Sequence, residues 1–412
     1  MTMLAVKKSI RAAALNMSLL LVSLLVALFL AELVIRFLES ANTRSIGAEI
    51  PLDQLNYNNL PVPLVQDPET IRVLSFGDSF AYGVVKPKYS YHQIAAGRLS
   101  AVGQPYTVVN LGEPAISFPQ YIQAHQQWSR VLDHNIALIN IYVGNDLADV
   151  TYGYVDKDAD PHHALAALSA NAQSGEGLMA SGDLTDILGR VNFVPRASPL
   201  RIFDYAYAIY LSKTQVITPA DMTLDPQVYI PAVVSLSDDD FLEIQRSIAS
   251  VFDPSRLRLH QPGYESAVEL ARYLQSQADE RPIQVLLSPP QIAVDQVLSD
   301  RLLPELNQPW DSDLPFLLLE SVFAAAAPDV KVVPLDGLLR CATQSLGALY
   351  IERDTHWNQA GNRVVGGAVA AAIAAEYGTW IPVEETRCPL TQNRRALRPE
   401  EAAFLEELLA TP

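Results

Sequence analysis

A serine lies on a short polar turn directly after a largely apolar run. Residues 71–76 are apolar enough to predict a buried strand, and they lead straight into Gly77-Asp78-Ser79. At the carboxyl end of a strand, on a turn that glycine permits, a serine hydroxyl can face the crevice where α/β proteins bind ligands. A turn that merely caps a helix has the same sequence, so this tripeptide alone is not specific. Asp78 is expected to cap the helix rather than to react.

Three further blocks carry polar side chains at equivalent places. They are expected at the carboxyl ends of the next two strands and just before the last core helix, where a doubly wound sheet brings such turns to one edge. Together the four blocks supply what acyl transfer needs: a hydroxyl nucleophile, a base, a group that orients the base, and donors for the oxyanion. The three blocks are Asn110-Leu111-Gly112, Gly144-Asn145-Asp146 and Asp354-Thr355-His356-Trp357-Asn358.

Serine, glycine, asparagine and histidine in four blocks, in this order, resemble the SGNH (GDSL-like) hydrolase superfamily. The resemblance covers a core of residues 71–146 and 263–380. It implies one role for each matching residue, and the chemistry agrees, because a serine needs a hydrogen-bonded imidazole whose other nitrogen is held by a carboxylate. The implied roles are Ser79 as nucleophile, His356 as general base, Asp354 as its orienting carboxylate, and the N–H groups of Ser79 and Gly112 with the Asn145 amide as oxyanion hole.

The spacing of the last block departs from the family pattern. The family has its aspartate three residues before the histidine, whereas Asp354 lies two before His356. Asp-x-His-Trp is similar to a block of SGNH-like polysaccharide O-acetyltransferases of the cell envelope. This similarity keeps transfer to a sugar open beside hydrolysis. Trp357 is expected to pack beneath the catalytic turn, and Asn358 to cap the following helix.

Other candidate sites have simpler interpretations. Residues 156–163 look like a calcium loop, but Pro161 and Ala167 stand where such a loop needs glycine and glutamate, so a solvated acidic loop is expected. Neither a metal site nor a cofactor is predicted. Four histidines that lack a neighbouring carboxylate are expected to be structural: His92, His125, His134 and His260.

Composition limits the compartment and the partners. The chain has 412 residues and a net charge of −17, which argues against nucleic acid as a partner. Residues 12–31 form a segment that is long and apolar enough to cross a membrane. The only charged side chains that precede it, Lys7, Lys8 and Arg11, are basic. We expect a single-pass anchor with a cytoplasmic N-terminus and a periplasmic or extracellular catalytic domain; a buried core helix is the alternative. Outside the cytoplasm Cys341 and Cys388 are free to form a disulfide, and two buried, unpaired cysteines are the alternative.

The order of the predicted elements indicates a flavodoxin-like three-layer α/β/α sandwich with a five-stranded parallel sheet, because near-continuous apolar strands alternate with helices. The rhythm stops after the third strand and resumes near residue 263. The expected parts are a cytoplasmic tip and anchor (1–40), a proline-punctuated linker (41–70), the split core, an insertion or lid (147–262), and a tail with a short amphipathic helix (381–412).

These observations predict a membrane-anchored serine esterase. Its substrate would be an acylated carbohydrate or a lipid ester, hydrolysed through an acyl-enzyme. The first alternative is an O-acyltransferase that modifies a cell-envelope polysaccharide with the same residues. The second is a non-catalytic glycan-binding protein on the same fold.

Overall fold

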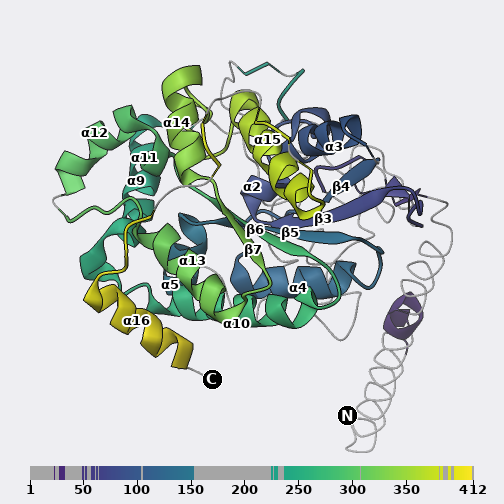
Figure 1. The fold of residues 1–412 in the computed structure, drawn as a ribbon, viewed down its shortest axis with the longest axis horizontal. Coiled ribbons are helices and arrows are strands. Elements are labelled where there is room, and N and C mark those ends of the chain that lie inside the picture. Colours follow the sequence, from purple (N-terminus) through teal and green to yellow (C-terminus); the bar gives the residue numbers. More distant parts are fainter. Residues whose placement is uncertain are drawn as a thin grey trace, which may run out of the picture.

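A five-stranded parallel sheet forms the centre of the protein (Figure 1). The computed structural model describes most of residues 57–152, 236–383 and 394–410, with 388–390 and short pieces within 23–52 and 224–230. Within these residues the strand order is β4-β3-β5-β6-β7, all parallel, which confirms the predicted sheet. The strands are β3 (Ile71–Gly77), β4 (Tyr106–Asn110), β5 (Ile136–Tyr142), β6 (Ile283–Ser288) and β7 (Lys331–Pro334).

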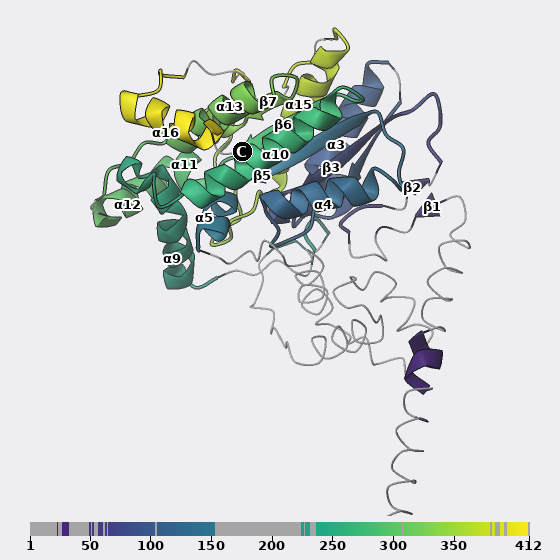
Figure 2. The same ribbon diagram turned by 90° about the horizontal axis from the view of Figure 1, so that it is seen from below.

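Helices cover both faces of the sheet, so the predicted three layers are present (Figures 1 and 2). One face carries α3 (Tyr91–Ala101), α14 (Asp336–Leu346) and α15 (Gln359–Glu376). The other carries α4 (Phe118–Trp128), α10 (Gln261–Ala278) and α13 (Leu314–Ala326). β3, β5 and β6 are buried along their whole length, because helices lie on both sides of them. A Cβ on Gly366 of α15 would lie 2.7 Å from the Ile94 side chain of α3, so the glycine permits these two helices to pack closely.

Residues 57–59, within the predicted linker, pack into the core. Tyr57 is 3% exposed, and its hydroxyl donates to Glu113 Oε1 at 2.5 Å. The Asn58 side chain donates to the carbonyls of Tyr82, at 2.9 Å, and Val85, at 2.7 Å. This short piece is therefore structurally part of the core, although the prolines and polar residues around it resemble a tether.

The predicted insertion and anchor lie largely outside the described residues. Near the insertion the structure describes α5 (Asn145–Tyr152) and α9 (Asp238–Ala249), and Ser237 caps α9 as expected. Residues 156–163, the expected acidic loop, lie outside the described residues. Most of the predicted anchor, residues 12–31, is left out as well. In the part of the chain that is described, no helix combines the length and apolar character needed to cross a bilayer.

The C-terminal tail is fastened to the core by a disulfide and by ion pairs. Cys341 in α14 is bonded to Cys388, which decides between the two alternatives in favour of the cross-link. Arg394 donates to the buried carboxylate of Asp336 at 2.7 Å. Beyond it, α16 (Pro399–Ala410) packs against α10 and α13. The tail is thus held at several points.

Breaking the disulfide is expected to lower the free energy of unfolding by about 4 kcal/mol, because the bond closes a loop between residues 47 positions apart. Cys341→Ser/Cys388→Ser, compared with the oxidised parent by urea unfolding, measures this loss. Dithiothreitol should destabilise the parent and leave the double variant unchanged. Equal stability of the two oxidised proteins would contradict the expectation.

Candidate functional site

The turn that carries Ser79 is built by close backbone contacts. Gly77 ends β3 with φ +151°, and a Cβ on it would lie 2.6 Å from the carbonyl oxygen of Asn140 on the neighbouring strand β5. Asp78 follows and accepts a hydrogen bond from the backbone N–H of Phe80 at 2.9 Å, so it caps α2 (Ser79–Tyr82) as expected. Ser79 is the first residue of this short helix and is partly exposed. Its backbone N–H has no helical partner, because no helical residue precedes it by four.

His356 and Asp354 form a direct pair despite their unusual spacing. The ring Nδ1 of His356 lies 2.6 Å from Asp354 Oδ1, and the same oxygen accepts the backbone N–H of His356 at 2.7 Å. Arg353, just before, has φ +54°, a left-handed conformation that costs a side-chain-bearing residue about 1–2 kcal/mol. The hydrogen bond from the His356 N–H closes a turn over only two residues, and this turn brings the ring back to the carboxylate. The pair has the geometry of an orienting carboxylate and its imidazole.

The second ring nitrogen of His356 is available for chemistry. Nε2 is buried and has no hydrogen-bond partner among the described residues, while the side chain as a whole is 19% exposed. The ring lies against Phe80, with centroids 5.2 Å apart, and Trp357 packs edge-on against the same Phe80 ring at 5.0 Å. The base turn therefore rests on the helix that begins with Ser79. No hydrogen bond joins Ser79 to His356 within the described part of the chain, so their pairing stays a prediction.

The charge around His356 favours its protonated form. Burial lowers the pKa of His356, but the charge of Asp354, their hydrogen bond and the charge of Asp78 together raise it above its ordinary value. Asp78 itself is fully buried, and desolvation raises the pKa of its carboxyl to about 7. The base therefore has a strong attraction for the proton it would take from a serine.

Two of the three predicted oxyanion donors, Gly112 and Asn145, already have partners. A Cβ on Gly112 would lie 2.3 Å from the backbone nitrogen of Tyr82, so only glycine fits beside α2. Its N–H donates to the side-chain oxygen of Asn110 at 2.9 Å. The Asn145 side chain, at the start of α5, hydrogen-bonds the Asp149 carboxyl. The oxyanion-hole assignment therefore stays a prediction, and it requires these groups to exchange their present partners for the substrate.

Two further carboxylates lie beneath the site, and the sequence analysis assigned them no role. Asp146 is fully buried and accepts hydrogen bonds from the Tyr121 hydroxyl at 2.7 Å and from the backbone N–H of Tyr142 at 3.0 Å. Desolvation raises the pKa of Asp146 well above its usual value and that of Asp149 to about 6. Their spacing of three residues puts both on one side of α5, which was the available signal. Both raise the pKa of neighbouring buried groups through their charge.

The described residues include no metal-binding cluster, and the four histidines expected to be structural are buried. No group of three or more histidine, cysteine, aspartate or glutamate side chains is placed to hold a metal ion in the described part. The ring of His92 contacts the Ser75 hydroxyl at 3.0 Å inside the core, as expected of a structural histidine. His125 and His134 are also buried, but they line a cavity.

Comparisons with known proteins give little beyond the geometry. No family model matches the sequence, and no curated protein matches it. One solved structure with some likeness is a lipase/acylhydrolase from Enterococcus faecalis. The match has 12% sequence identity and a TM-score of 0.31, and it covers 78% of this chain and 100% of that chain. This likeness is too distant to carry an argument about function.

Replacing Asp354 with asparagine should shift the pH dependence of any His356-dependent reaction. The neutral ring is the base, so the rate of the parent should rise with pH through the raised pKa of His356. Asp354→Asn removes the carboxylate charge that raises this pKa, so the acidic limb should move to lower pH. The plateau rate should fall by about 10²–10⁴ because the ring tautomer is no longer fixed. Stopped-flow ester hydrolysis between pH 5 and 9 measures both effects, with the exposed Asp329→Asn as control; identical profiles for the parent and Asp354→Asn would refute the pairing.

Proposed function

We propose that this protein is a serine esterase of the SGNH type, anchored in the membrane with its catalytic domain outside the cytoplasm. The observation that carries the proposal is the state of the His356 ring. One nitrogen is held by Asp354 at 2.6 Å, and the other is buried without a partner beside the helix that starts at Ser79. Such an imidazole is prepared to accept one proton from a nearby donor.

The reaction would run in two halves. In the first, Ser79 Oγ attacks the ester carbonyl carbon while its proton passes to His356 Nε2. The oxyanion that forms is stabilised by the N–H groups of Ser79 and Gly112 and by the Asn145 amide. Collapse breaks the ester C–O bond, and the imidazolium returns the proton to the leaving alcohol. In the second half, water attacks the acyl carbon while its proton passes to His356 Nε2. The bond between the acyl carbon and Ser79 Oγ then breaks, the imidazolium returns the proton to Oγ, and the acid is released.

Replacement of Ser79 tests the enzyme proposal. Ser79→Ala should lower p-nitrophenyl acetate turnover by at least about 10³-fold and abolish labelling by a fluorophosphonate. Ser345→Ala, at an exposed serine of α14, should change neither. Turnover that is independent of Ser79, together with no labelling, would contradict an enzyme and favour the glycan-binding alternative.

The acyltransferase alternative is favoured by the Asp354-Thr355-His356-Trp357 block alone. It uses the same acyl-enzyme and differs in the acceptor of the second half-reaction, where a sugar hydroxyl would replace water. Incubation with an acetyl donor and an envelope oligosaccharide separates the two, because a transferase forms acetylated sugar faster than free acetate. Faster release of acetate would support the esterase.

The location outside the cytoplasm is supported by two independent features. Residues 12–31 form an apolar segment of membrane-spanning length behind Lys7, Lys8 and Arg11. The disulfide between Cys341 and Cys388 is of a kind that persists in oxidising compartments. In cells, the full chain should resist carbonate extraction from membranes, and protease added to spheroplasts or intact cells should digest its catalytic domain. Recovery of the chain in the carbonate supernatant would contradict the anchor.

A further inference from the structure

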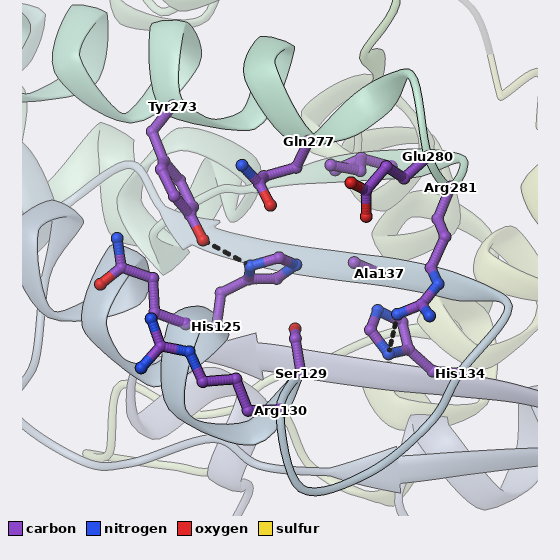
Figure 3. A pocket seen from close by; sticks show the side chains of 11 residues that line it. His125, Ser129, Arg130, His134, Ala137, Tyr273, Gln277, Glu280 and Arg281 are labelled. Atoms are coloured by element: carbon purple, nitrogen blue, oxygen red, sulfur yellow. Dashed lines mark hydrogen bonds between the residues drawn. The ribbon is translucent and has the colours of Figure 1, made fainter.

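A cavity of about 360 Å³ opens at the amino-terminal ends of two central strands. Ala137 of β5 and Ile283 of β6 are register partners and line it, with α4 on one side and α10 on the other (Figure 3). Ser79 and Asn145 follow the carboxyl ends of β3 and β5, so this cavity lies at the opposite edge of the sheet. It is therefore separate from the proposed active site, and its volume is typical of small-molecule sites.

Two arginines and one glutamate, Glu280, supply the charged side chains of the lining. Arg130 and Arg281 lie on opposite sides of the view in Figure 3, and Ser129 lies between them. The hydroxyl oxygen of Ser129 is buried and has no hydrogen-bond partner among the described residues. Arg281 donates to Asp133 at 2.9 Å, whereas Arg130 is exposed.

Two buried histidines form the interior of the cavity. His125 and His134 are each 4% exposed, and their ring centroids lie 6.1 Å apart. Nδ1 of His125 contacts the Tyr273 hydroxyl at 2.7 Å, and Nδ1 of His134 lies 3.1 Å from an Arg281 nitrogen. Burial lowers the pKa of each ring to about 4, and the charge of Arg281 adds to the effect. Both rings are therefore neutral near pH 7.

We propose that this cavity binds a small tetrahedral oxyanion, a phosphate or sulfate group, either free or carried by a small molecule. Two guanidinium groups and the Ser129 hydroxyl contribute hydrogen-bond donors to one cavity, and a doubly charged oxyanion accepts charge-assisted bonds better than a singly charged carboxylate. Among the described residues no third metal-binding side chain joins the two histidines, so a cation is the poorer fit.

Binding is coupled to proton uptake. An anion in the cavity places a negative charge beside both imidazoles, so it raises the pKa of His125 and His134. The complex then binds more protons than the free protein, and affinity increases as pH falls from 7 toward 5. The charged and titratable groups around the rings are Arg72 on β3, Arg130 after α4, Asp133 and His134 before β5, Tyr273 on α10, and Glu280 and Arg281 before β6.

Sulfate is the suitable probe because its charge does not change over this pH range. Isothermal titration into the full-length protein at pH 6 and constant ionic strength should show tighter binding of sulfate than of acetate. Arg130→Met should weaken sulfate binding by about tenfold, since it removes a charge-assisted donor. Glu280→Gln should strengthen it at least about twofold, because a neighbouring negative charge is lost.

Two variants serve as controls. Arg363→Met, at an exposed arginine of α15, and Ser79→Ala should both bind sulfate like the parent, which separates this site from the esterase proposal. The His125 and His134 ring signals in NMR spectra should titrate at higher pH when sulfate is present. Thermal unfolding verifies that Arg130→Met is folded. Equal binding by Arg130→Met and Arg363→Met, binding of acetate as tight as that of sulfate, or unshifted histidine signals would overturn the proposal.

Discussion

The site depends on two places where one backbone touches another with no side chain between them. Gly77 lies against the Asn140 carbonyl, and Gly112 lies against the Tyr82 nitrogen. These contacts fix the short helix α2 between the ends of β4 and β5, and so fix where Ser79 begins. A Cβ at either glycine would push the turn that carries Ser79 away from the sheet, because a contact of 2.3–2.6 Å between non-bonded atoms is a steric clash. Ser79 is thus positioned by backbone contacts that are possible only because Gly77 and Gly112 have no Cβ.

Electrostatics around the base follow from burial. Asp78 and Asp146 have almost no contact with solvent, so their ionisation is costly and their pKa values are raised. The pKa of His356 is raised by the same negative surroundings, because a carboxylate charge nearby favours the protonated ring. The arrangement at the other edge of the sheet is the reverse. There burial, helped by the charge of Arg281, suppresses protonation of His125 and His134.

The five strands and most core helices could be predicted because each is a local pattern: an apolar run of strand length, or an apolar face at helical spacing. The pairing of Asp354 with His356 could be expected only from the resemblance, since the turn that joins them depends on a hydrogen bond from the His356 N–H to the Asp354 carboxylate, which their spacing does not reveal. The burial of Asn58 could not be predicted from the sequence, because its hydrogen-bond partners, the carbonyls of Tyr82 and Val85, are backbone groups that leave no sequence pattern. The cavity was missed because His134 and Arg281 are distant in sequence. Short helices such as α11 (Gln291–Val294) carry too few residues for a period to show.

The register of the central strands has a consequence for how the chain folds. Ala137 pairs with Ile283, so the two strands in the middle of the sheet come from distant parts of the sequence. Strands β3 to β5 can associate early from one continuous segment, and β6 with β7 from another. Joining the halves is a long-range encounter, and such topologies fold slowly even though the entropy of closing a long loop grows only by about 0.6 kcal/mol per doubling. Until that docking step, the apolar edge of β5 stays unpaired, and this intermediate is the species most prone to aggregate or to need a chaperone.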